Sequence, residues 1–186
     1  MPLPQARRPD PVGTGRRTVW RAMHEENPHP AGQVEPAAGV RQMDTSGGGL
    51  SVVVTSVSSD SHTWNLVFLQ LALEELGHRV VNLGACVPDD LVVAECLRTR
   101  PDLVVVSSVN GHGFRDGTRL VGRLRACPEL ATVPVVIGGK LGISGPGGSH
   151  SREQLRAAGF DAVFEEGAGM ATLRSYTGQL TASLTS

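Results

Sequence analysis

The feature that most constrains the fold is a strand-like run that leads through a polar cluster into an apolar segment. Residues Ser51 to Val57 are rich in β-branched side chains, as is typical of a buried strand. Residues Leu66 to Leu76 have helical spacing and end at Gly77, a residue type that often caps a helix C-terminus. A buried strand followed by a helix is the beginning of a βαβ unit with parallel strands. The polar residues between the two elements are Ser59, Asp60, Ser61 and His62.

The rest of the chain repeats this alternation of short apolar runs and amphipathic stretches. The pattern predicts an α/β fold, a flavodoxin-like (Rossmann-like) doubly wound five-stranded parallel sheet. Four further strands are expected at His78 to Leu83, Pro101 to Ser107, Val133 to Ile137 and Asp161 to Phe164. Four further helices are expected after Val87, at Arg115 to Ala126, from a cap at Ser149 or Ser151 to Gly159, and at Gly167 to Leu184.

The first predicted helix is unusually apolar. Its stripe of leucines is broadened by other apolar side chains, so we expect the helix to be well buried. The stripe consists of Leu66, Leu69, Leu73 and Leu76, and the broadening residues are Val67, Phe68 and Leu71.

Residues 1–48 differ in composition from the rest of the chain. They hold seven of the twelve prolines and have no sustained apolar period. Such a segment buries too little apolar surface to offset the entropy of ordering it. We predict a disordered, Pro/Gly-rich extension over residues 1–48 and one folded domain over residues 49–186. An alternative for the extension is a docking arm that uses Trp20 and Met23.

Charge and cysteine usage exclude several classes of function. With 17 basic and 18 acidic residues, the chain has no electrostatic basis for binding nucleic acid or a membrane surface. The three cysteines are widely spaced and form no zinc pattern, which suits a reducing compartment. No apolar run is long enough to span a bilayer and no secretion signal is seen, so we expect a soluble, cytoplasmic protein.

Polar and glycine-containing segments follow four of the five predicted strands. The carboxyl ends of parallel strands meet at one edge of the sheet, where ligands bind in this class of fold, so these segments predict one shared site. Asp60 and His62 are the residues most suited to chemistry there. The pair could cap a helix, orient a catalytic imidazole, or form a carboxylate–histidine–metal arrangement. The segments are Ser59 to His62, Ser107 and Ser108, Gly138 and Gly139, and Glu165 to Gly167.

With these segments in place, the chain resembles the cobalamin-binding domain family. The family has an Asp-x-His-x-x-Gly loop, a later Ser-x-Leu and a Gly-Gly pair. The corresponding stretches here are Asp60-Ser-His62-Thr-Trp-Asn65, Ser107-Ser-Val109 and Gly138-Gly139. The likeness extends over nearly all of residues 50–180 and is greatest to the small subunits of glutamate mutase (methylaspartate mutase).

The resemblance implies a cofactor, a metal ligand and a partner. The cofactor would be adenosylcobalamin, with His62 as the lower axial ligand of cobalt and Asp60 as the acceptor for the other ring nitrogen. The nucleotide tail would enter a slot between the sheet and the first helix. The chain would act with a separate large catalytic subunit in the isomerisation of L-glutamate and threo-3-methylaspartate, and would supply no catalytic side chain itself. The cofactor-binding residues implied are Ser59, Asp60, Ser61, His62, Thr63, Ser107, Ser108, Val109, Gly138, Gly139, Lys140 and Gly142.

Three positions depart from the family pattern. Asn65, next to Trp64, stands where the family has glycine, so we expect an altered mouth of the tail slot. Val109 replaces the family leucine. Lys140, the only lysine, stands where the mutase small subunits usually have asparagine, and it either neutralises the cofactor phosphate or is solvated.

Two other classes of function stay open on the sequence alone. One is a corrinoid-binding module of a methyltransferase or of a B12-responsive regulator. The other is an interaction domain without a cofactor, which Asn65 favours. The remaining histidines of this domain, His78, His112 and His150, are expected at the surface.

Overall fold

The computed structural model describes residues 48–142, 148–165 and 169–184. The predicted disordered extension lies outside the described residues except for Gly48, and so do Glu166 and Gly167. Within the described ranges no helix is both long and apolar enough to cross a membrane.

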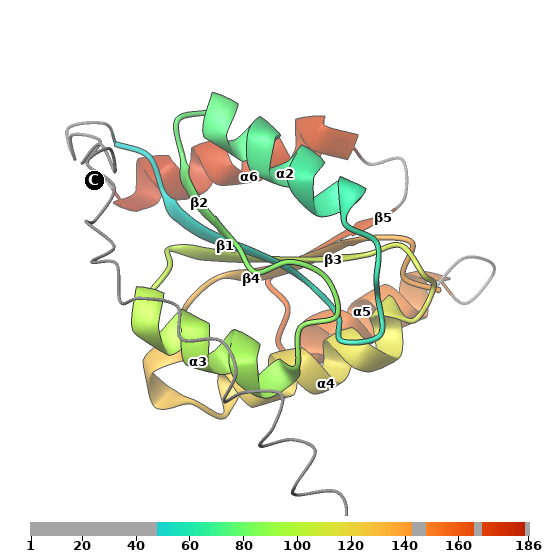
Figure 1. Ribbon diagram of the computed structural model, residues 1–186. Coiled ribbons are helices and arrows are strands. Elements are labelled where there is room, and N and C mark those ends of the chain that lie inside the picture. The colour runs from blue at the N-terminus through green and yellow to red at the C-terminus, as the bar shows by residue number, and fades with distance from the viewer. Residues whose placement is uncertain (1–47, 143–147, 166–168, 185–186) are drawn as a thin grey trace, which may run out of the picture. The chain divides into compact units, whose positions relative to one another are not determined.

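Strands and helices alternate along the described chain, as the sequence predicts (Figure 1). The strands are β1 (Ser51–Ser56), β2 (Arg79–Asn82), β3 (Leu103–Ser108), β4 (Val135–Gly139) and β5 (Ala162–Glu165). The α-helices are α2 (Trp64–Glu75), α3 (Asp89–Thr99), α4 (Gly113–Arg125), α5 (Gly148–Ala158) and α6 (Gly169–Leu184), and a 3-10 turn covers Pro128–Leu130.

The five strands form one parallel sheet with the order β2-β1-β3-β4-β5. This is the flavodoxin-like order, so the predicted fold class is confirmed. In the register of the central pair, Val54 of β1 lies beside Val105 of β3 and Ser56 lies beside Ser107. The direction of strand order reverses between β1 and β3, which places a topological switch point at their carboxyl ends.

Helices cover both faces of the sheet. Figure 1 shows α2 and α6 on one face and α3, α4 and α5 on the other. Consecutive residues of β1 pack into the two different layers: Val52 and Val54 join the core under α2 and α6, whereas Val53 joins the core under the other helices. Because both faces are buried, the strand reads as a continuous β-branched run rather than an alternating one.

The prediction that α2 is well buried on a broad face is wrong. Leu66 and Leu73 pack into the core, but Phe68 is 54% exposed and Leu71 is 61% exposed, and Val67 is exposed as well. A single helix layer on a sheet covers only the stripe that faces the strands. The additional apolar residues of α2 therefore lie at the surface.

Two smaller expectations are also corrected. His78 is buried rather than at the surface, and its Nδ1 accepts a hydrogen bond of 3.2 Å from the backbone N–H of Leu50. Helix α5 begins at Gly148, so neither Ser149 nor Ser151 precedes it as a cap. His112 and His150 are exposed, as predicted.

Candidate functional site

The loops that leave β1 and β3 meet at the carboxyl edge of the sheet. The first loop runs from Val57 to Thr63, and the second runs from Val109 to His112. The backbone of Gly111 donates to the carbonyl of Lys140, which joins the segment after β4 to the same group. The predicted convergence of polar segments from different strands is therefore present in the fold.

Asp60 is the buried centre of this group. Its carboxylate has no exposed surface and accepts hydrogen bonds on both oxygens. Oδ1 accepts from the backbone N–H of His62 at 3.1 Å and lies 2.7 Å from the Nδ1 atom of the His62 ring. Oδ2 accepts from the backbone N–H of Val109 at 2.6 Å and from that of Asn110 at 3.3 Å. One carboxylate thus links the loop after β1 to the loop after β3.

These contacts favour the charged form of Asp60 and fix the tautomer of His62. Burial alone would raise the pKa of Asp60, but the backbone N–H of Val109, the two contacts from His62 and the N–H of Asn110 together lower it below its ordinary value. An ionised carboxylate only accepts hydrogen bonds, so the proton of the neutral imidazole is on Nδ1. Nε2 then carries the lone pair, and no described residue hydrogen-bonds it. The His62 side chain is 48% exposed, which leaves this lone pair accessible to a ligand.

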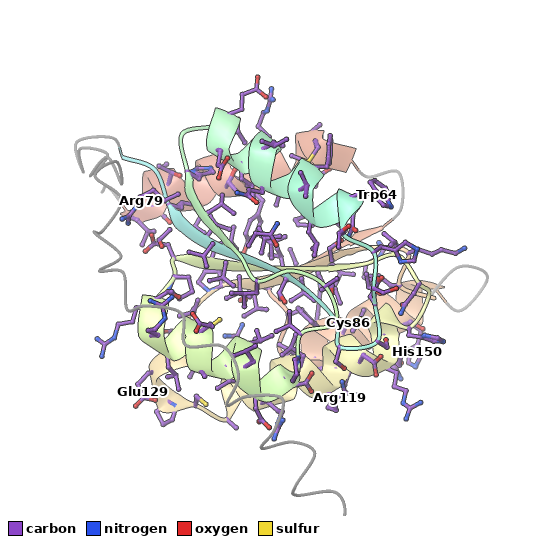
Figure 2. The ribbon with its side chains drawn as sticks, viewed as in Figure 1. Trp64, Arg79, Cys86, Arg119, Glu129 and His150 are labelled. Carbon is purple, nitrogen blue, oxygen red and sulfur yellow. The ribbon has the colours of Figure 1, made fainter. Side chains whose placement is uncertain are left out.

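A second set of polar contacts holds the β1–α2 loop against helices of the other layer. Ser59 Oγ donates to Asp116 of α4, and Arg119 of α4 pairs with Asp116 at 2.9 Å and with Asp89 of α3 at 2.6 Å. Arg119 also donates to Ser58 Oγ at 2.7 Å. Burial would raise the pKa of Asp116, but the Ser59 hydrogen bond and Arg119 lower it. Figure 2 shows Arg119 and Trp64 on opposite sides of the sheet. The β1–α2 loop, which contacts Arg119 through Ser58 and leads into Trp64, therefore spans the edge of the sheet.

A cavity of about 580 Å³ lies beside His62, between the sheet and the layer of α2 and α6. Its volume is in the range of about 300–1,000 Å³ that small-molecule sites occupy. Six predicted site residues line it: His62, Ser107, Val109, Gly138, Gly139 and Lys140. Six others do not: Ser59, Asp60, Ser61, Thr63, Ser108 and Gly142.

The two glycines at the end of β4 stand where a side chain would crowd the neighbouring strands. A Cβ on Gly138 would meet Phe164 of β5 at 3.3 Å. Gly139 has a φ of +102°, and a Cβ there would overlap the carbonyl oxygen of Ser108. Only glycine combines this conformation with so close an approach of β4 to β3, which explains the Gly-Gly pair at the wall of the cavity.

The remaining predicted residues act on the loops rather than on the cavity. Ser108 Oγ donates to the side chain of Asn110, which in turn donates to the backbone of Ser59. Gly142 has a φ of +75° and packs on the backbone of Gly111. Ser61 and Thr63 are exposed beside His62.

The cavity also has walls that the sequence prediction did not assign. In the sequence Asn65 stands out only as a departure from the family pattern, but in the structure it is buried and donates from Nδ2 to Ser107 Oγ at 2.6 Å. The spacing of Trp64 and Phe68 on one helix could have indicated a shared face. The lining residues that α6 contributes could not be predicted from the sequence, because they depend on how α6 packs beside α2. The unassigned lining residues are Trp64, Asn65, Phe68, Leu69, Val105, Val106, Phe164, Met170 and Leu173.

No group of three or more His, Cys, Asp or Glu side chains converges as a metal site within the described ranges. His62 is therefore a single accessible imidazole at the mouth of a cavity, without other protein ligands around it. This arrangement suits a metal whose remaining ligands are brought by the group that contains it.

Comparison with known proteins agrees with this geometry. The family model described as "B12 binding domain" matches residues 50–173. The glutamate mutase sigma subunit of Fusobacterium nucleatum is 31% identical over 118 residues, which cover 62% of this chain and 85% of that protein. The glutamate mutase sigma subunit of Halobacterium salinarum is 32% identical over 119 residues, which cover 64% of this chain and 78% of that protein.

Solved structures show the same fold at lower identity. A cobalamin-binding protein from Desulfitobacterium hafniense superposes with a TM-score of 0.56 and 23% identity, over 71% of this chain and 59% of that one. The receiver domain of a sensor histidine kinase from Pseudomonas aeruginosa superposes with a TM-score of 0.53 and 17% identity, over 72% of this chain and 98% of that one. The fold is thus shared by proteins of different function, whereas the match of the family model extends over two thirds of the chain. The chain belongs to the B12-binding domain family, and its relatives in that family include the glutamate mutase sigma subunits.

Proposed function

We propose that this chain is the cobalamin-binding small subunit of an adenosylcobalamin-dependent mutase of the glutamate mutase type. It binds the cofactor with the cofactor's own base displaced from cobalt, and His62 is the lower axial ligand in its place. The substrate is held by a separate, larger catalytic subunit. The relatives named glutamate mutase sigma subunit support the assignment to this class of enzyme.

The observation that carries the proposal is the contact of 2.7 Å between Asp60 Oδ1 and His62 Nδ1 at the mouth of the cavity. A carboxylate that accepts from one ring nitrogen fixes the tautomer and raises the basicity of the other nitrogen as a ligand. Neutral imidazole is a common ligand for transition metals. The buried, ionised Asp60 supplies this condition before any metal is bound.

The cavity supports binding of the displaced nucleotide tail. It begins at His62 and runs between the sheet and α2, with Gly138 and Gly139 where backbone can approach a bulky group. Lys140, exposed at the cavity wall, is the basic side chain available there for the phosphate of the tail. We assign His62, Ser107, Val109, Gly138, Gly139 and Lys140 to direct binding, and Asp60 to the positioning of His62.

When bound, adenosylcobalamin supplies a weak cobalt–carbon bond whose homolysis provides the adenosyl radical. This chain's own residues bind and orient the cofactor and hold a proton on Nδ1 of His62.

The catalytic subunit, the cytoplasmic location and the limits of the binding domain at residues 49–186 are parts of the same proposal. The three free cysteines, one of them buried, are compatible with a reducing compartment.

The test is electron paramagnetic resonance of the Co(II) form bound to the full chain, with and without nitrogen-15 histidine. We expect the hyperfine splitting from the axial nitrogen to change with the label, because the ligand is a histidine. The His62→Ala variant should lose this splitting. The His112→Ala variant should keep it, because His112 is an exposed histidine that does not line the cavity. A splitting that is the same with and without the label would assign the axial nitrogen to the cofactor's own base and would contradict the proposal.

A further inference from the structure

Asn65 is a buried amide that uses only one of its two polar atoms. It lies in the first turn of α2, lines the cavity and is 5% exposed. Its Nδ2 donates to Ser107 Oγ at 2.6 Å, but its Oδ1 is buried and accepts no hydrogen bond. Buried polar atoms are nearly always paired, so an unpaired carbonyl oxygen at a cavity wall requires an explanation.

A purely structural role does not account for this amide. The hydrogen bond to Ser107 ties α2 to β3 through Nδ2 alone, and the burial of Oδ1 then only costs stability. Ser107 is in the same condition, because its hydroxyl accepts from Asn65 but donates to no described residue. The two side chains together present an unused acceptor and an unused donor.

The surroundings make this pair stand out. Most of the cavity wall is apolar, with Phe68, Leu69 and Phe164 among its members. In small-molecule sites of this kind, a few polar groups in an apolar wall fix the orientation and the identity of the ligand. A site built to hydrogen-bond a ligand group also rejects analogues that lack it, because its own polar atoms are then left unpaired.

We propose that Asn65 is a specificity-determining residue, whose Oδ1 accepts a hydrogen bond from an N–H or O–H group on the nucleotide tail of the corrinoid. The inference rests on the proposed function, because it assumes that the tail occupies this cavity. Two parts of a tail supply such a donor. One is a ribose hydroxyl, which every nucleotide-bearing corrinoid has, and the other is the exocyclic amine of an aminopurine base. Dimethylbenzimidazole, the lower base of cobalamin, has no N–H once it is attached to ribose.

The experiment measures dissociation constants for three corrinoids on the full chain: cobinamide, which has no nucleotide, cobalamin, and a cobamide with adenine as its lower base. The test variants are Asn65→Leu, which keeps the size and removes both polar atoms, and Asn65→Ala, which cannot overpack. The matched control is Gln70→Leu, another amide on α2, which bonds Glu74 and Asn82 outside the cavity. We expect both Asn65 variants to bind the adenine cobamide about ten-fold more weakly and cobinamide unchanged, with cobalamin also weakened if ribose is the donor, and the control to match the wild type throughout.

The pattern of losses identifies the donor. If the base donates, the wild type prefers the adenine cobamide over cobalamin, and both variants lose this preference. If ribose donates, the variants lose the same factor for both. Variants indistinguishable from the wild type, or variants that bind the tail more tightly because Asn65 blocks the slot, would overturn the inference while leaving the proposed function intact. Retention of none of the three corrinoids by the wild-type chain would overturn both.

Discussion

At the residue scale, Asp60 holds the site together because a single carboxylate satisfies four donors. Two of these donors belong to His62, and the other two are backbone groups of Val109 and Asn110. A buried carboxylate with this many N–H donors stays ionised well below neutral pH, since each donor favours the charged form. The orientation of His62 therefore depends on a group that is itself fixed by the neighbouring loop.

The substitution Asp60→Asn tests this dependence without any cofactor. An amide has one acceptor oxygen. It stays beside the backbone N–H groups of Val109 and Asn110, which can only donate, and the single backbone N–H of His62 loses its acceptor. The amide nitrogen then faces His62 Nδ1, which must accept, so the ring proton moves to Nε2. We expect nitrogen-15 NMR of the variant to report the Nε2–H tautomer, and that of the wild type to report Nδ1–H. The same tautomer in both proteins would show that Asp60 does not control the ring.

His78 gives the fold a pH dependence of its own. Burial lowers the pKa of His78 below its ordinary value of 6.5. The folded state therefore binds the proton more weakly than the unfolded state does. The free energy of unfolding therefore keeps its full value above pH 6.5. As the pH drops from 6.5 toward the pKa of His78 in the folded state, the free energy of unfolding falls by up to about 1.4 kcal/mol per pH unit.

Urea denaturation between pH 7 and pH 5 measures this slope. The His78→Asn variant keeps an acceptor for Leu50 and has no ionisable group, so we expect its stability to vary less over this range. The exposed His112 provides the control, because His112→Asn should retain the wild-type slope. Equal slopes in the wild type and in His78→Asn would assign the pH dependence to other groups.

At the element scale, α2 has a buried stripe and an exposed apolar stripe. Leu73 is 0% exposed and Leu71, two residues earlier, is 61% exposed. The same substitution at the two positions should therefore have different effects on stability. We expect Leu73→Ala to lower the free energy of unfolding by about 2–5 kcal/mol, and Leu71→Ala to change it by less than about 0.5 kcal/mol.

The urea midpoints of the two variants provide the comparison. The slope of the free energy of unfolding against urea concentration should be the same in both variants and in the wild type. A loss of several kcal/mol in Leu71→Ala would mean that the exposed stripe is covered in solution. The exposed apolar side chains of α2 begin at Trp64 and Phe68, which also line the cavity. The surface that stays uncovered is thus continuous with the candidate site.

At the scale of the whole molecule, the parallel sheet was predictable because strands buried on both faces have β-branched runs that no other element requires. The convergence of Asp60, His62, Ser107 and Gly138 followed from the rule that carboxyl ends of parallel strands share an edge. The unpredicted features depend on packing. An apolar helix does not reveal which of its sides meets the sheet, so the exposure of Leu71 was not foreseen. The pairing of Asn65 with Ser107 joins residues 42 apart and needs the relative placement of α2 and β3.

The proposed division of labour between two subunits also belongs to the scale of the whole molecule. A second cavity of about 450 Å³ lies near Gly49 and His78, at the amino edge of the sheet and away from His62. Because this second cavity is away from His62 and the proposal assigns the substrate to a separate subunit, we expect the chain loaded with adenosylcobalamin to show no isomerisation of L-glutamate or threo-3-methylaspartate by itself. An NMR assay of the loaded chain, with a known glutamate mutase catalytic subunit added in a parallel sample, measures this. Turnover by the chain alone would contradict the two-subunit proposal.

The contacts of Asp60 also impose an order of events on the making of this protein. The backbone groups that hold its carboxylate come from residues 49 and 50 positions later in the chain. While the ribosome is still synthesising the second strand, Asp60 and His62 are already part of the chain, but two of the four donors to the carboxylate are not. The carboxylate gains all four donors only when the third strand and its loop have been made and the strand has paired with the first. The contacts that position the proposed cobalt ligand are therefore completed late in the folding of the chain.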